Sequence, residues 1–189
     1  MSNGHILVVE DEETLADLYT TWLSDEYTVD AVHSGEAALE LLDEKPDVVL
    51  LDRRLPDCSG DMVLGEIRER EFDSRVAMIS AVTPGFDVLG MDFDTYLTKP
   101  ASEADLNGVV EVLLARAGYG DRLTDYFALV SKRATLRANL EVASERRYQD
   151  LDARITELER QLEDPLSEFT REEFESVFGP GFTEYPEFS

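Results

Sequence analysis

Five side chains of this sequence have the chemistry needed to bind a metal ion or to receive a phosphoryl group. They are Glu10, Asp11, Asp52, Ser80 and Lys99. If the three carboxylates lie within a few ångströms of one another, they cannot all stay ionised unless a cation is close by. All-oxygen carboxylate ligation with room for water suits Mg²⁺. A carboxylate held beside a metal ion, an ammonium and a hydroxyl can then attack phosphorus as a nucleophile.

These five positions come together only if the apolar runs that precede them form one sheet. Short apolar runs that predict strands cover residues 5–9, 27–32, 47–51, 75–80 and 95–98. Helical spacing of apolar residues predicts helices over 15–23, over 37–42 with Ser34 as the N-cap, and over 59–69 and 103–116. Alternating strands and helices predict a doubly wound α/β fold with a five-stranded parallel sheet. Ligands bind such sheets outside the carboxyl ends of the strands, which is where the five residues lie.

The segment after residue 117 has a different pattern, so we divide the chain into domains 1–117 and 118–189. Two apolar stripes with helical spacing run between residues 121 and 164, and they are out of register with each other. This predicts two helices that hinge near 142–144 and fold back as an αα-hairpin. The alternative is one long helix that dimerises as a coiled coil. A short helix over 170–178 and a loose C-terminal tail complete the expected structure.

The charge balance is strongly acidic, with 42 acidic and 17 basic residues and a formal net charge of −25. Such a chain repels nucleic acids and anionic membranes at long range. Because the acids are spread along periodic segments, we interpret them as the solvated surface of a folded protein, as in salt-loving organisms. The absence of a long apolar stretch, of a signal sequence and of a second cysteine besides Cys58 predicts a cytoplasmic protein without membrane contact.

Four motifs, VVEDE, PDVVLLDRRLPDCSG, MISA and TYLTKP, occur in an order and spacing that resemble two-component receiver domains over roughly residues 4–116. The resemblance implies a flavodoxin-like fold and a Mg²⁺-dependent phosphorylation switch driven by a sensor histidine kinase. By this resemblance Asp52 is the phosphoacceptor and Asp11 a direct metal ligand. Glu10 would act on the metal through a water, and the backbone carbonyl of Arg54 would be a further ligand.

The same resemblance gives roles to residues from the last two strands of the predicted sheet. Ser80 matches the hydroxyl that moves onto the phosphoryl group, and Lys99 matches the lysine that pairs with it. Tyr96 matches the aromatic residue that changes rotamer when that hydroxyl moves. The Lys99–Pro100 peptide bond is expected to be cis.

The sequence departs from the receiver pattern between Ser80 and Lys99, which is about three residues shorter than usual. Pro84, Gly85 and Gly90 in this stretch disfavour a full fourth helix, and we expect one short turn around 87–91. The usual dimer face of receivers is therefore in doubt, and a homodimer stays an open expectation. From residue 118 onward, RLTDYFALVSKRATL and YQDLDARITELERQL resemble the helical HalX domain of salt-loving archaea.

Other residues have simpler interpretations. Glu12 and Glu13 are expected to be first-turn acids that favour the helix dipole, and Cys58 is expected to be a loop residue. His5 and His33 lack the partners a metal site needs and are interpreted as structural.

The leading hypothesis is a response regulator that phosphorylates and dephosphorylates only its own Asp52, so it is not an enzyme with a separate substrate. Its C-terminal helices would act on an output partner that is either protein or DNA, including transcription regulation. An Asp-nucleophile phosphatase is a competing hypothesis, but Arg54 stands where such enzymes have a general acid. A protein-interaction adaptor is a further alternative.

Overall fold

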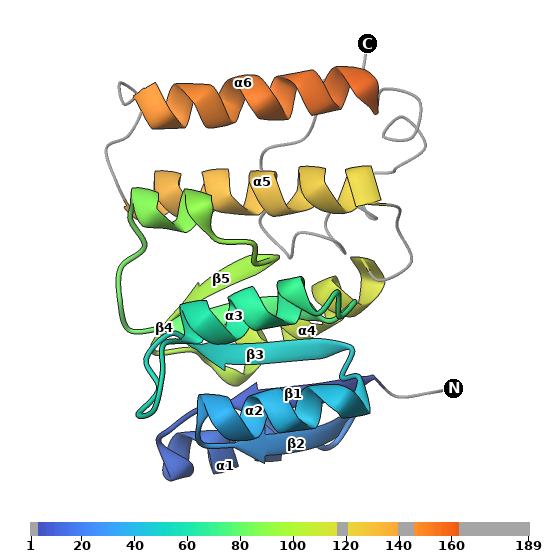
Figure 1. Ribbon diagram of the computed structural model, residues 1–189, viewed down its shortest axis with the longest axis vertical. Helices are drawn as coiled ribbons and strands as arrows, with labels where there is room; N and C mark the ends of the chain where they lie inside the picture. The colour runs from blue at the N-terminus through green and yellow to red at the C-terminus, as the bar shows by residue number, and fades with distance from the viewer. Residues whose placement is uncertain (1–3, 117–120, 140–145, 163–189) are drawn as a thin grey trace.

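The computed structural model describes residues 4–116, 121–139 and 146–162 (Figure 1). The predicted helix over 170–178, the hinge at 142–144 and the C-terminal tail lie outside these residues. Within the described part, no helix is both long and apolar enough to cross a bilayer.

A five-stranded, fully parallel sheet forms the centre of the N-terminal part. The strands are β1 (His5–Val9), β2 (Thr28–Val32), β3 (Val48–Asp52), β4 (Arg75–Ser80) and β5 (Thr95–Thr98), and their order is β2-β1-β3-β4-β5. The strands β3 and β4 are almost entirely buried because helices cover both faces of the sheet. Strand order reverses between β1 and β3, which places a ligand-binding crevice at their carboxyl ends.

Two helices, α1 (Glu13–Leu23) and α4 (Glu103–Arg116), pack against one face of the sheet. The buried residues on this face include Tyr19 and Leu23 from α1 and Leu106 and Val110 from α4. The opposite face is covered by α2 (Gly35–Leu41) and α3 (Gly60–Glu69), and the turn η1 (Leu42–Glu44) follows α2. The side chain of Ser34 accepts a hydrogen bond from the Ala37 amide, which confirms the predicted N-cap of α2.

The link between β4 and β5 contains only the short 3₁₀ helix η2 (Phe86–Gly90). This confirms the prediction of a shortened fourth helix. The space beside η2 and β5 is occupied by α5 (Asp121–Asn139), which contacts both elements. Buried residues of α5, including Phe127 and Val130, belong to the same hydrophobic cluster as Phe93 and Tyr96.

The helices α5 and α6 (Arg146–Gln161) form an antiparallel pair, with α5 between α6 and the sheet (Figure 1). The Tyr126 hydroxyl donates to Glu159, and Arg133 forms an ion pair with Asp152. Since the earlier residue of α5 meets the later residue of α6, the helices run in opposite directions. The predicted αα-hairpin is therefore confirmed over the coiled-coil alternative.

Candidate functional site

Four strand ends meet at one edge of the sheet and bring the predicted site residues together. Glu10 and Asp11 follow β1, Asp52 is the last residue of β3, Ser80 is the last residue of β4, and Lys99 follows β5. The parallel register holds them level, because Asp52 is paired with Ile79 and Ser80 with Thr98. The site is thus a product of strand order and register.

The three acids form a compact cluster. One carboxylate oxygen from each of Glu10, Asp11 and Asp52 lies within 4.8 Å of the others. Glu10 and Asp52 are buried, with 3% and 7% of their surface exposed, whereas Asp11 is exposed. Burial raises the pKa of Glu10, and the nearby charge of Asp52 adds to this, although Lys99 opposes both. The cluster therefore places excess negative charge where water cannot fully solvate it.

Lys99 balances part of that charge. Its Nζ lies 2.6 Å from an Oε atom of Glu10 and also forms an ion pair with Asp52. Burial lowers the pKa of the Lys99 ammonium, but hydrogen bonds to Asp52 and Glu10 outweigh it, and the net shift is upward. The ammonium thus stays charged at neutral pH and bridges the acids of two strands.

The loop after β3 is tightly closed around Asp52. The Arg54 amide donates to a carboxylate oxygen of Asp52 at 2.8 Å, and the Gly60 amide donates to the Arg53 carbonyl at 2.9 Å. A Cβ atom on Gly60 would lie 2.2 Å from the backbone oxygen of Asp52, so only glycine fits here. Ser59 then caps α3 by accepting from the Met62 amide.

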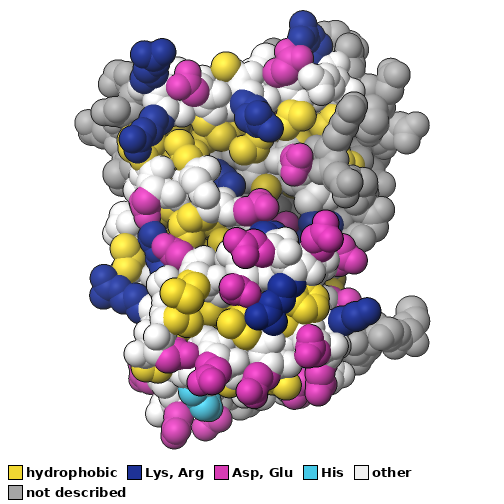
Figure 2. All heavy atoms as spheres, viewed as in Figure 1, with side chains coloured by type: hydrophobic (Ala, Val, Ile, Leu, Met, Phe, Trp, Pro, Cys, Tyr) yellow, Lys and Arg dark blue, Asp and Glu magenta, His cyan; other side chains and the backbone are white. Residues whose placement is uncertain are grey.

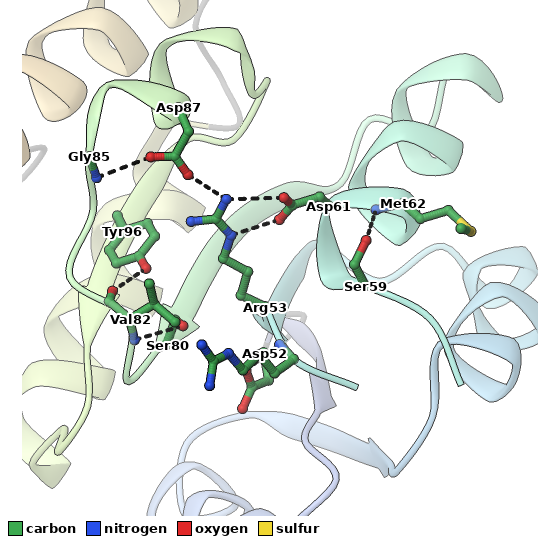
Figure 3. Close-up of polar contacts among 11 residues, drawn as sticks. Asp52, Arg53, Ser59, Asp61, Met62, Ser80, Val82, Gly85, Asp87 and Tyr96 are labelled. Atoms are coloured by element: carbon green, nitrogen blue, oxygen red, sulfur yellow. Dashed lines mark hydrogen bonds and ion pairs between the residues drawn. The ribbon is translucent and has the colours of Figure 1, made fainter. Parts of the chain in front are cut away.

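Ser80 and Tyr96 are both tied to the segment that leaves β4 (Figure 3). The buried Ser80 hydroxyl oxygen accepts from the Val82 amide at 3.1 Å. The Tyr96 hydroxyl donates to the Val82 carbonyl at 2.7 Å. The backbone N–H and C=O groups of Val82 are therefore bonded to Ser80 and Tyr96, the two predicted switch residues.

The donor set fits a hard divalent cation. All three side chains in the cluster offer carboxylate oxygens, and one of them is exposed enough to leave room for water. Within the described residues, this is the group of acids that could hold a metal ion.

The comparison with known proteins identifies the family. The model of the response regulator receiver domain matches residues 6–111, which is more than half of the chain. The chain belongs to the response-regulator receiver family. The HalX domain model matches residues 115–178 and so covers α5 and α6. Both family expectations from the sequence are confirmed.

Three relatives illustrate the likeness of this response regulator to known proteins. A candidate transcriptional regulator of Haloferax volcanii is 51% identical over 132 residues, which are 69% of this chain and 23% of that protein. The alkaline phosphatase synthesis transcriptional regulatory protein PhoP of Bacillus subtilis is 37% identical over 120 residues, covering 61% of this chain and 50% of PhoP. The structure of the BeF₃-activated DrrB receiver domain is 30% identical with a TM-score of 0.54, covering 61% of this chain and all of that domain.

The chain thus spans about a quarter of the length of the Haloferax volcanii protein and half of the length of PhoP.

The predicted site residues of the receiver all lie at the expected edge of the sheet. Carboxylate oxygens of Glu10, Asp11 and Asp52 lie within 4.8 Å of one another, and Lys99 pairs with Glu10 and Asp52. Ser80 and Tyr96 are both bonded to Val82. The Lys99–Pro100 peptide bond is cis, as expected. The carbonyl of Arg54 is in the loop beside Asp52, and its role as a ligand stays a prediction.

Sequence reasoning missed the polar contacts that three residues, Asp57, His33 and Arg53, make around this pocket. Asp57 accepts from the Gly35 and Glu36 amides, each at 2.9 Å, and these bonds lower its pKa while closing the start of α2. His33 contacts the Glu10 carbonyl through Nδ1. Arg53 forms ion pairs with Asp61 and Asp87. None of these pairs has a local sequence signal, because each joins residues at least eight positions apart.

Proposed function

We propose that this chain is the signal-receiving part of a response regulator that takes a phosphoryl group from a sensor histidine kinase onto Asp52. The observation that carries the proposal is the Lys99 ammonium, which bridges Glu10 and Asp52 inside the acidic pocket. This arrangement supplies a nucleophilic carboxylate and a fixed positive charge on the same side of the sheet.

In the transfer, a carboxylate oxygen of Asp52 forms the new P–O bond while the P–N bond to the kinase histidine breaks. The histidine nitrogen keeps the electron pair of that bond. Lys99 stabilises the negative charge that spreads over the phosphoryl oxygens. The Arg54 amide, which donates to Asp52, orients the carboxylate for attack. Phosphorylation of its own aspartate, followed by hydrolysis of that acyl phosphate, would be the only chemistry of the chain.

The residues that would hold Mg²⁺ are Glu10, Asp11, Asp52 and the backbone carbonyl of Arg54. When bound, the ion neutralises the charge that develops on the phosphoryl group. The excess acid charge in the pocket supports this assignment, because one lysine balances three carboxylates incompletely.

Ser80 and Tyr96 would report the phosphorylated state. A phosphoryl group on Asp52 adds oxygens that can accept a hydrogen bond from the Ser80 hydroxyl, and movement of that hydroxyl toward them would break the bond that its oxygen accepts from the Val82 amide. Loss of the Ser80–Val82 bond would free the segment after β4, and Tyr96 would lose its acceptor when that segment moves. Since α5 packs on β5 and η2, the C-terminal helices are placed to sense this movement.

The C-terminal helices α5 and α6 would carry the output of the switch. Relatives such as PhoP are named transcriptional regulatory proteins, which favours an effect on transcription. A net charge of −25 disfavours direct contact with DNA, so we propose that a protein partner, or a second copy of the chain, is the immediate target.

The test is phosphorylation by acetyl phosphate in the presence of Mg²⁺, followed by mass spectrometry of the intact chain. Wild type should gain one phosphoryl group, and Asp52→Asn should gain none. Asp43→Asn, which changes an exposed acid in η1, is the matched control and should behave as wild type. Labelling of the Asp52→Asn variant at the wild-type level would refute the site.

A further inference from the structure

Arg53, the residue after the phosphoacceptor, connects two elements that are far apart in the sequence (Figure 3). Its guanidinium donates through Nε and Nη2 to both carboxylate oxygens of Asp61, at 3.0 and 3.1 Å, in the first turn of α3. The same Nη2 donates to Asp87 in η2. Because the Arg53 side chain is only 16% exposed, water screens these bonds less than it screens a surface ion pair.

The two acids hold Arg53 differently. The pair with Asp61 is bidentate and fixes the guanidinium to a regular ten-residue helix. Asp87 belongs to a five-residue 3₁₀ helix, and its side chain is 52% exposed. Arg53 is therefore anchored on α3 and uses a remaining N–H to restrain η2.

The restraint acts on the same stretch of chain that Ser80 and Tyr96 hold. That stretch runs from Ser80 through Val82 to Asp87. Near its start, Val82 is bonded to Ser80 and Tyr96. At its end, Asp87 is bonded to Arg53, the residue after Asp52. Once the Ser80 bond is lost, the Arg53–Asp87 ion pair still connects η2 to the loop that follows Asp52.

Movement of η2 would reach α6 through a shared groove. A groove of about 650 Å³ lies between η2, α5 and α6, and its apolar lining includes Phe86, Leu89, Leu129 and Leu151. Asp87 lines the same groove, and so do Arg147 and Arg154 of α6. Figure 2 shows hydrophobic side chains gathered on this face between α5 and α6, with basic side chains beside them. Asp87 is thus both the partner of Arg53 and part of the groove wall.

We propose that Arg53 is a positioning residue that holds η2 in its resting position through Asp87 and so couples the state of Asp52 to the groove. This inference rests on the proposed function, because it concerns how phosphorylation of that site is passed on. Phosphorylation replaces the single negative charge of the Asp52 carboxylate, on the residue next to Arg53, with a phosphoryl group that carries about 1.5 to 2 negative charges. The phosphoryl group then competes with Asp87 for the Arg53 guanidinium. The single bond to the exposed Asp87 should break before the bidentate pair with Asp61 does.

The coupling must be reciprocal. If phosphorylation releases η2, then release of η2 by mutation must favour the phosphorylated conformation. Asp87→Asn keeps the size of the side chain and removes its charge, whereas Asp87→Glu keeps the charge. Glu66→Gln removes an exposed ion pair with Arg70 elsewhere on α3 and is the matched control.

The experiment titrates beryllofluoride, a stable mimic of the phosphoryl group, into the full chain at saturating Mg²⁺. We expect Asp87→Asn to bind it about two- to fivefold more tightly than wild type, the range expected for loss of one partly exposed ion pair. Asp87→Glu and Glu66→Gln should bind it as wild type does. The affinity for Mg²⁺ alone should be the same in all four proteins, which a general loss of structure would not produce.

Amide hydrogen exchange gives an independent readout of the groove. Without beryllofluoride, peptides covering η2 and residues 147–154 should exchange faster in Asp87→Asn than in wild type, and Arg53→Gln should show the same change. If wild type responds to beryllofluoride but Asp87→Asn matches the Glu66→Gln control in affinity and exchange, the coupling role of Arg53 is wrong and the phosphorylation site stands. If wild type itself does not bind beryllofluoride, both the proposed function and this inference are overturned.

Discussion

At the scale of single residues, Lys99 has two opposed effects on the pocket. Its ammonium neutralises part of the acid cluster by pairing with Glu10 and Asp52. The same carboxylate oxygens are the ones a divalent cation needs, so lysine and cation compete for them. In the proposed transfer, however, the Lys99 ammonium would stabilise the charge on the phosphoryl group. By this proposal one side chain would weaken metal binding and assist the reaction.

This leads to a prediction for Lys99→Met, which keeps most of the side-chain volume and removes the charge. The rate of phosphorylation by acetyl phosphate should fall by about 10²- to 10³-fold, as for loss of one charge-stabilising donor. The affinity for Mg²⁺ should rise, since Glu10 and Asp52 lose their internal counter-charge. Initial rates at saturating Mg²⁺ and a direct Mg²⁺ titration separate the two effects. Lys45→Met, at an exposed position, is the control, and a fall in Mg²⁺ affinity in Lys99→Met would contradict the argument.

At the scale of elements, local patterns and long-range contacts were not equally predictable. The strands and helices followed from apolar spacing, because burial of one face imposes a period that the sequence displays. The pocket followed from its motifs, and the short η2 from Pro84, Gly85 and Gly90. The apolar stripe of α5 showed that one of its faces is buried, but the same stripe would suit another helix or a second copy. That it covers Phe93 and Tyr96 could be learned only from the fold.

The polar contacts beneath and beside α5 could not be predicted from the sequence either. Arg75 donates to Thr124 of α5, and the buried Asp94 accepts from Arg68 and Arg75. Each of these pairs joins residues 19 or more positions apart. The Arg53–Asp87 pair is a similar case, since it joins residues 34 positions apart. With 42 acidic residues in the chain, the sequence does not predict which acid pairs with which arginine.

A second prediction concerns Lys132, which is buried at the docking face of α5. Its Nζ lies 5.2 Å from the centre of the Phe93 ring. Burial lowers its pKa below 10.5, although Asp92, Asp94 and Asp125 oppose that shift and Arg68 adds to it. The charged form is thus less stable in the folded protein than in the unfolded chain. Lys132→Met should raise the free energy of unfolding at neutral pH, by on the order of 1 kcal/mol.

The pH dependence follows from the direction of that shift. Between the folded-state pKa and the unfolded value near 10.5, the unfolded chain binds more protons, so the stability of wild type rises with pH. The advantage of Lys132→Met should therefore shrink across that window and vanish above it. Urea unfolding of both proteins at a series of pH values measures the difference. A loss of stability in Lys132→Met at neutral pH that disappears as the pH rises past about 10.5 would mean that attraction from the acids and the ring outweighs desolvation.

At the scale of the whole molecule, the sheet and the C-terminal helices share one hydrophobic cluster on the face that carries α2 and α3. The receiver and HalX matches are separate in sequence, yet residues of α5 and α6 are buried in the same core as β3 and β4. Because α5 contacts β5 and η2, a movement of these elements reaches α5 through direct packing. The full chain carries a net charge of −25, and Figure 2 shows acidic side chains spread over much of one face.

That charge makes stability depend on salt. At an ionic strength of about 0.1 M, charges repel over a Debye length of about 10 Å, and at about 1 M over about 3 Å. Because folding brings the acids closer together, repulsion destabilises the folded state more than the unfolded chain. The free energy of unfolding should therefore rise steadily as KCl is added. Urea titrations at increasing KCl concentrations measure this rise.

Screening can be separated from a general effect of cosolutes on burial. Sucrose at matched osmolality strengthens burial without screening charge, so it should stabilise the protein less than KCl does. As the pH falls toward the isoelectric point near 4.2, acids become protonated, and the increment gained from KCl should shrink. Two results would show that screening of the acidic surface is not the cause of the salt dependence. One is equal stabilisation by sucrose and KCl, and the other is a KCl-induced rise in the free energy of unfolding that does not depend on pH.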